Sequence, residues 1–160
     1  MYPWIVLLHI IGALIFVMAH GASVMVAMRL RAVADRNQQA ALLEVSGLSI
    51  GVMYIGLALL LIGGVWAGFA GNHWGGLWIW AALSVLIVVV AVMYSVATPY
   101  YGRMRAAAGV AGGATADRFK PPATEADLAG LATSQRPFWL AAVGGIGLLV
   151  ILWLMVIKPF

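Results

Sequence analysis

The chain has no cysteine and few charged side chains. Of its 160 residues, 9% are charged and 64% are hydrophobic. The absence of cysteine excludes disulfides, thiolate metal sites, cysteine nucleophiles and haem attached through cysteine pairs. A soluble domain is about 25% charged, so this chain has too few charges to cover a surface exposed to water. These deficits indicate an integral membrane protein.

The long apolar segments also contain no well-buried Asp, Glu, Lys or Arg, and Glu44 lies only at the edge of one segment. Proton relays and ion-coupled transporters use ionisable groups within the membrane. The sequence also contains no Gly-rich phosphate loop, no HExxH and no convincing Ser–His–acid set. We therefore name no catalytic residue and expect a protein that is not an enzyme.

Four apolar segments are long enough to cross a bilayer, at residues 4–28, 45–70, 77–98 and 138–157. A helix of about 20 residues spans the hydrocarbon core. The chain is therefore predicted to be an all-α, polytopic membrane protein, with one integral membrane domain over 1–160 that forms a four-transmembrane-helix bundle. The short "AGNHWGG" turn predicts that the second and third spans form an antiparallel hairpin.

A loop over about 99–137 is predicted between the third and fourth spans. Within it, Thr124 follows two prolines and precedes Glu125 and Asp127, a pattern typical of the N-capped start of a short helix. Pro137 follows at a position expected to be the first turn of the fourth span, where proline is tolerated.

Basic residues are distributed unevenly between the two sides of the bundle. Eight of the nine lie in the two long connections: Arg29, Arg31, Arg36, Arg103, Arg105, Arg118, Lys120 and Arg136. Only Lys158 lies on the opposite side. The positive-inside rule predicts a protein of the cytoplasmic (inner) membrane with cytoplasmic connections and both termini outside. Because topology accounts for the basic residues, the expected partner is the lipid bilayer and no nucleic acid is expected.

Two histidines stand out in the first span, within "LLHIIGALIFVMAHG". His9 and His20 are eleven residues apart, which puts them on nearly one helix face but about 16 Å apart along the axis. They therefore cannot share one metal ion. They could serve two sites at different depths, or one could bind a ligand while the other is structural.

The repeated Val-Met-Tyr triplet of the second and third spans lies at the depth expected for His20. It supplies Met53 and Met93, each followed by a tyrosine. Histidine with methionine suits copper(I), and histidine with histidine or methionine suits haem iron. The same residues also have structural interpretations, because membrane histidines commonly bond to a neighbouring helix and methionines fill cores.

The first span, with its two histidines, resembles the opening helix of CopD-like membrane domains. The order of the four spans, the "GVMY" of the second span and the terminal "WLMVIKPF" are similar to a small bacterial integral membrane family of unknown function. In the broader group, HemJ-type enzymes have a first-span histidine implicated in haem b binding. That resemblance implies His9 in "LLHII" as an axial ligand. The basic residue that HemJ-type enzymes use in a later span has no counterpart here, which argues against porphyrinogen oxidation.

These observations lead to two functional hypotheses. In the first, the bundle binds haem b or copper for electron transfer, sensing or metal handling, with His9 and His20 as cofactor-binding residues, and with His20, Met53 and Met93 as the copper alternative. In the second, it is a non-catalytic accessory subunit of a larger respiratory or photosynthetic membrane complex. Glycine pairs such as Gly47/Gly51 and Gly64/Gly68 would then pack against partner subunits or a second copy of the chain. Copper permeation is a third possibility.

Overall fold

A computed structural model of the chain describes residues 1–110 and 124–160. In these residues all regular structure is helical: α1 (Tyr2–Leu30), α2 (Arg36–Ala70), α3 (Leu77–Ala108), α4 (Glu125–Ala132) and α5 (Arg136–Ile157). Four helical stretches of the described residues are long and apolar enough to cross a membrane, namely α1, α2, α3 and Ala129–Ile157, which includes α5. The predicted all-α fold with four spans is confirmed. Arg118 and Lys120 lie outside the described residues.

Two helices extend further than the apolar segments alone indicated. α2 begins at Arg36, where the Asp35 side chain accepts a hydrogen bond of 2.8 Å from the backbone N–H of Gln38. α3 continues past Pro99 to Ala108 and ends at Gly109, whose φ is 71°. The prediction of a loop over 99–137 is therefore wrong for about its first ten residues, which belong to α3. Hydropathy identifies only the part of α3 that lies in lipid. The helix itself ends later, at Gly109, whose left-handed conformation is typical of a helix C-terminus.

The short helix predicted after Thr124 is present as α4. Thr124 and Asp127 form a capping box, in which each side chain bonds to the other residue's backbone N–H. The backbone and side-chain hydrogen bonds from Thr124 lower the pKa of the Asp127 carboxyl. The cap is therefore fully formed above the ordinary pKa of an aspartate and weakens as the pH falls below it. Pro137 lies in the first turn of α5, as expected.

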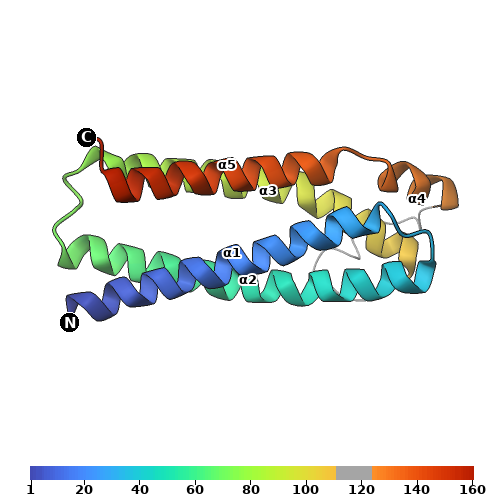
Figure 1. The fold of residues 1–160 in the computed structure, drawn as a ribbon, viewed down its shortest axis with the longest axis horizontal. Helices are drawn as coiled ribbons and strands as arrows, with labels where there is room; N and C mark the ends of the chain where they lie inside the picture. Colours follow the sequence, from blue (N-terminus) through green and yellow to red (C-terminus); the bar gives the residue numbers. More distant parts are fainter. Residues whose placement is uncertain (111–123) are drawn as a thin grey trace.

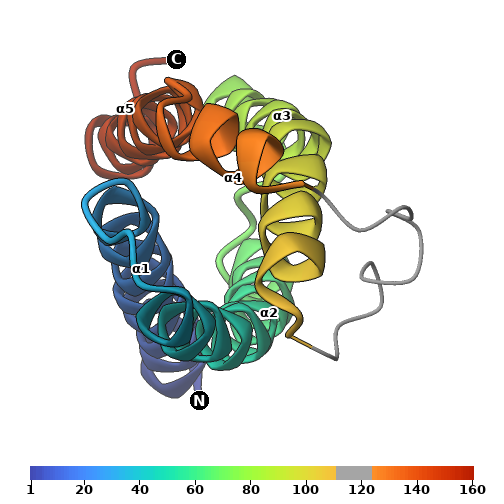
Figure 2. The same ribbon diagram turned by 90° about the vertical axis from the view of Figure 1, so that its right-hand side faces the viewer.

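The four long helices form two pairs. α1 packs along α2 and α3 packs along α5, with fewer contacts between the pairs (Figure 1). α2 and α3 are antiparallel and joined by a short turn, as predicted, but they contact each other far less than α2 contacts α1. Figure 2 shows the four long helices from one end, arranged in a ring.

Glycines allow the close approach of α1 to α2. A Cβ on Gly56 would lie 2.6 Å from the backbone nitrogen of Phe16, and one on Gly63 would lie 2.7 Å from that of His9. A Cβ on Gly12 would likewise overlap the backbone of Leu60. Such contacts between backbones are the way in which small residues stabilise helix pairs in lipid. Of the predicted glycine pairs, Gly47, Gly64 and Gly68 face side chains, whereas Gly51 has nothing within 4 Å.

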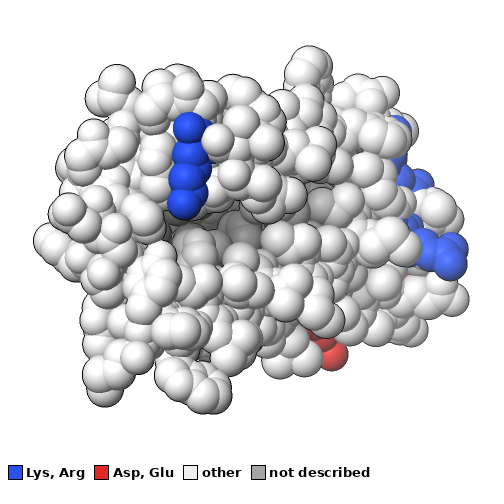
Figure 3. All heavy atoms as spheres, turned by 60° about the vertical axis from the view of Figure 1, so that its left-hand side comes forward, with Lys and Arg blue, Asp and Glu red and all other residues white. Residues whose placement is uncertain are grey.

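One end of the molecule, here called the basic end, carries Arg29, Arg31, Arg36, Arg103 and Arg136 together with α4. The largest buried cluster lies there and includes Leu30, Leu43, Tyr100 and Met104. The other end, here called the termini end, carries both termini and the 71–76 turn (Figure 1). In Figure 3, most blue atoms gather at the right, toward the basic end, and the surface between the two ends is largely uncharged. That charge segregation suits a helix bundle lying in a bilayer.

Each end is joined by side-chain contacts. At the basic end, Tyr101 Oη donates to the Ser23 carbonyl over 2.9 Å, so α3 is bonded to α1. At the termini end, Tyr2 Oη and His73 Nε2 are hydrogen-bonded at 3.1 Å, and the Lys158 ammonium lies 5.2 Å from the centre of the Trp78 ring. The Tyr101–Ser23 hydrogen bond thus connects the two helix pairs at the basic end, whereas the Lys158–Trp78 contact joins α5 to α3 within one pair.

Replacing Gly56 by Ala is expected to destabilise the bundle by about 1–3 kcal/mol, because the added methyl forces α1 and α2 apart. Gly51→Ala, on the same helix but with open space around its Cβ, is the matched control and should leave stability unchanged or slightly raised. Thermal unfolding in detergent measures both variants. Equal stability of the two would contradict the glycine-dependent packing.

Candidate functional site

A cavity of about 740 Å³ lies between the two helix pairs. It is lined by residues of all four long helices, and most of its wall is aliphatic or aromatic. From Glu44 to Leu57 the wall follows about 20 Å of α2, at the helical rise of about 1.5 Å per residue. Small-molecule and cofactor sites have volumes of about 300–1,000 Å³ and are mostly apolar with a few polar groups, so this cavity is of the size and character of a ligand site.

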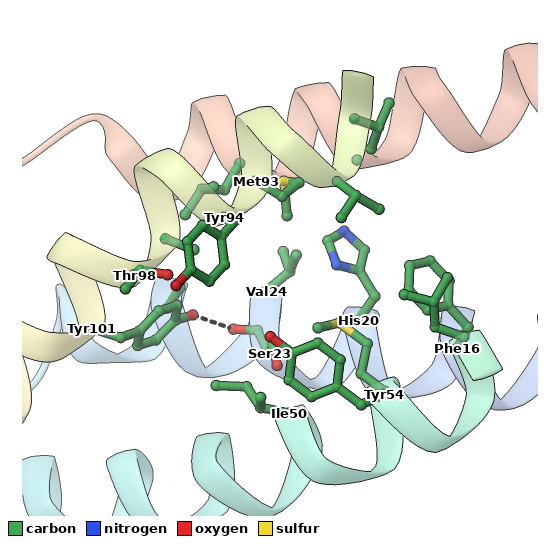
Figure 4. A pocket seen from close by; sticks show the side chains of 18 of the residues that line it. Phe16, His20, Ser23, Val24, Ile50, Tyr54, Met93, Tyr94, Thr98 and Tyr101 are labelled. Atoms are coloured by element: carbon green, nitrogen blue, oxygen red, sulfur yellow. Dashed lines mark hydrogen bonds between the residues drawn. The ribbon is translucent and has the colours of Figure 1, made fainter. Parts of the chain in front are cut away.

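His20 projects from α1 toward α3 and α5, in the wall of the cavity (Figure 4). Its ring lies against Gly144 of α5, where a Cβ would be 2.8 Å from Cε1 and in direct contact with Nε2. Nε2 is buried and has no hydrogen-bond partner in the described part of the chain. Leaving a buried polar atom unpaired costs about 1–3 kcal/mol, and a ligand that bonded to this nitrogen would offset that cost.

Ser23, one turn further along α1, contributes a second polar atom of the same kind. Its Oγ is buried without a partner among the described residues, and the residue lines the cavity. In Figure 4 its carbonyl accepts the hydrogen bond from Tyr101, drawn as a dashed line. α1 therefore supplies the cavity with an unpaired imidazole nitrogen and an unpaired hydroxyl.

The two Val-Met-Tyr triplets meet at this cavity. Met53 and Tyr54 line it from α2, and Met93 and Tyr94 line it from α3. Both tyrosines keep about half of their surface accessible, 53% for Tyr54 and 55% for Tyr94, so the cavity wall is open rather than sealed where they lie. The structure thus brings His20, Met53 and Met93, which the sequence grouped by depth, to a single cavity.

His9 lies elsewhere, in the seam between α1 and α2. Its Nδ1–H donates to the Leu60 carbonyl over 2.8 Å, and its ring lies against Gly64. This is the interhelical hydrogen bond expected from the structural interpretation of a membrane histidine. His9 does not line the cavity that contains His20. His9 and His20 lie in different surroundings although they are on nearly the same face of α1, because α1 crosses α2 obliquely (Figure 1).

Sequence reasoning missed Arg105 as a site residue and counted it only as a topology signal. Its side chain is 8% exposed, lines the cavity, and donates from Nη2 to the Leu43 carbonyl over 2.7 Å. The guanidinium lies over Gly47, where a Cβ would be 2.7 Å from Nη2. The sequence feature that could have revealed this role is the position of Arg105, four residues after Tyr101 in a helix that continues beyond the apolar span.

Residues 1–110 and 124–160 contain no group of three or more His, Cys, Asp or Glu side chains placed to hold a metal ion. Methionine, a further possible metal ligand, is not among these four residue types. Around the cavity, His20, Met53 and Met93 offer one imidazole and two thioethers, and Glu44 is the acidic residue that also lines it. The imidazole and thioethers are softer donors than a carboxylate.

The chain belongs to a family described as predicted integral membrane protein (DUF2269), whose model matches residues 3–159. No curated protein and no solved structure matches the chain. Membership of this family establishes an integral membrane protein.

Replacing Gly144 by Ala should turn the His20 ring away from α5, because the new methyl would occupy the space of Nε2. Gly145→Ala is the matched control, since nothing lies within 4 Å of its Cβ. Imidazole ¹⁵N spectra of histidine-labelled protein report the result. We expect the His20 signals to shift in Gly144→Ala alone while those of His9 stay in place. Unchanged His20 signals would contradict the packing of the ring on α5.

Proposed function

We propose that this chain is a haem b-binding membrane protein that holds the cofactor in the cavity between the α1–α2 and α3–α5 pairs. The observation that carries the proposal is His20, which lines the cavity and whose buried Nε2 has no hydrogen-bond partner in the described residues. Nε2 faces Gly144 of α5, so binding iron would require the imidazole to turn from α5 into the cavity. A neutral imidazole with an unpaired nitrogen is the commonest protein ligand of haem iron.

The residues present fit this cofactor in three respects. The cavity volume of about 740 Å³ lies within the range of cofactor sites. Its wall is mainly apolar, as a lipid-soluble porphyrin requires. Met53 and Met93 line the same space as His20, and a thioether is the second axial ligand in one common class of haem protein.

When bound, haem b would supply one-electron chemistry, so electron transfer or redox sensing is the role we propose.

This proposal reverses the order in which the sequence and the resemblance to HemJ-type enzymes ranked the two histidines. His9 already donates Nδ1–H to Leu60 and lies in a seam where two helix backbones touch. His20 lies at a cavity and has an unpaired nitrogen. We therefore assign the ligand role to His20 and a helix-pairing role to His9.

Copper is the second candidate, supported by the presence of His20, Met53 and Met93 around one cavity. One imidazole and two thioethers are donors suited to copper(I). Haem is preferred because the cavity is far larger than a single ion needs.

For the membrane orientation, we propose that the basic end faces the cytoplasm and that both termini lie outside the inner membrane. The support is the distribution of arginines over the connection that follows α1, the end of α3 and the start of α5.

Detergent-purified protein reconstituted with haem b should show a b-type reduced-minus-oxidised spectrum at about one haem per chain. His20→Ala should lose at least nine-tenths of this signal, because it removes the axial nitrogen. His73→Ala, at the termini end, is the matched control and should retain haem. Met93→Leu should keep haem bound and shift the reduction potential if that thioether is the second ligand.

Haem retention in His20→Ala, with loss in His9→Ala, would overturn the assignment of the ligand. A colourless protein with stoichiometric copper, lost in His20→Ala, would establish the copper alternative. A chain that binds neither and co-purifies with other membrane polypeptides would favour the accessory-subunit hypothesis.

The orientation is testable because the chain has no native cysteine. A cysteine replacing Asn72 in the 71–76 turn should react with a membrane-impermeant maleimide in intact cells. A cysteine replacing Asp35, at the basic end, should react only after the membrane is permeabilised. The reverse pattern would place the basic end outside.

A further inference from the structure

The cavity opens to the outside between α2 and α3. Of the described residues that line it, those of α1 and α5 are buried or half-buried, whereas all the exposed ones belong to α2 or α3. These exposed residues, here called the mouth of the cavity, are Glu44, Leu48, Tyr54, Val90 and Tyr94. α2 and α3 share few contacts, and on the other side the His20 ring of α1 rests on Gly144 of α5.

The two tyrosines of the mouth lie where the bundle faces lipid. Tyr54 is within the apolar segment 45–70 and Tyr94 is within the apolar segment 77–98. A ligand that enters the cavity between them comes from the bilayer and not from water. The mouth therefore selects molecules that dissolve in lipid.

Tyr54 and Tyr94 also lie at the same depth. The hydrogen bond from Arg105 to the Leu43 carbonyl sets the register of α3 against α2. Tyr94 precedes Arg105 by eleven residues and Tyr54 follows Leu43 by eleven residues. Because the two helices are antiparallel, both tyrosines lie about 16 Å from that bond, toward the termini end.

Both tyrosine hydroxyls are available for hydrogen bonds. Neither has a partner among the residues that the structure describes. Each ring has about half of its surface accessible and lies among the side chains that line the cavity (Figure 4). A hydroxyl without a partner is costly in hydrocarbon, so two of them at one depth suit an uncharged ligand with two acceptor oxygens.

We infer that the mouth of the cavity binds the head group of a lipid-soluble quinone, with Tyr54 and Tyr94 donating hydrogen bonds to its carbonyl oxygens. A quinone head is planar and uncharged, and its two carbonyl oxygens can only accept hydrogen bonds. The tyrosine rings add aromatic surface against which such a head can stack. The quinone site shares the cavity with the haem proposed above but does not rest on haem binding.

The test titrates the haem-free full chain in nanodiscs with a benzoquinone that carries a ten-carbon alkyl chain. An alkylbenzene with the same chain is the comparison ligand, because it has the ring and the tail but no carbonyl oxygens. Ring ¹³C spectra of tyrosine-labelled protein report binding at Tyr54 and Tyr94. We expect the quinone to bind at least tenfold more tightly, the size of one to two neutral hydrogen bonds.

Tyr54→Phe and Tyr94→Phe should each weaken quinone binding about threefold to tenfold, because each removes one hydroxyl donor. In each variant the remaining tyrosine reports the titration. Ser95→Ala is the matched control, since it removes an exposed hydroxyl next to Tyr94 that does not line the cavity. Thermal unfolding of each variant separates loss of binding from loss of folding.

A second pair of variants tests the place of entry. Val90→Trp adds bulk at the mouth, one turn from Tyr94, and should weaken or slow quinone binding. Val88→Trp adds the same bulk at an exposed position of α3 that does not line the cavity, and should leave binding unchanged.

The outcomes separate the quinone site from the proposed function. Quinone binding that depends on both tyrosines, in a chain that binds no haem, supports the quinone site and removes the haem proposal. Equal binding of quinone and alkylbenzene overturns the quinone site, even where haem binds through His20. Quinone binding that is unchanged when both tyrosines are replaced by phenylalanine overturns it as well.

Discussion

The contact between the backbones of α1 and α2 determines how the rest of the bundle is arranged. Gly12, Gly56 and Gly63 remove the side chains that would separate these helices, so α1 lies along α2 for much of its length. A helix that commits one face to such a seam has less surface left for other neighbours. α3 pairs with α5 instead, and the two pairs share far fewer contacts with each other than α1 shares with α2 or α3 with α5. The cavity is the space that this pairing leaves between them.

The cavity explains why polar side chains are tolerated in spans that otherwise exclude them. Ionisable groups within a membrane are costly and are kept where they bond to a partner or serve a ligand. His9 belongs to the first kind, since its Nδ1–H is bonded to Leu60. His20 belongs to the second in our account, because its Nε2 has no partner among the described residues and its side chain lines a cavity large enough for a cofactor. The two imidazoles of one apolar helix thus have different reasons to be there.

Much of this architecture could be predicted from the sequence, and the failures have physical causes. Hydropathy predicted four spans, and the Thr124–Asp127 pattern predicted α4, because both are local signals. Depth along the helices grouped His20 with Met53 and Met93, and all three line the cavity. The helix ends in α2 and α3 were missed because a helix continues beyond the bilayer where its hydropathy falls. The separation of His9 from the cavity depends on the crossing of α1 and α2, which periodicity within one helix does not reveal. Arg105 was missed because an arginine beyond a span reads as a topology signal unless the neighbouring helix is known.

The most direct test of the account is an experimental structure of the full chain, purified with its native ligands and reconstituted in a lipid nanodisc. We expect planar density between the α1–α2 and α3–α5 pairs, bonded to the imidazole of His20. A bundle whose two pairs close on each other, with His20 bonded to a protein group and no density between them, would contradict the central claim that this cavity is a cofactor site.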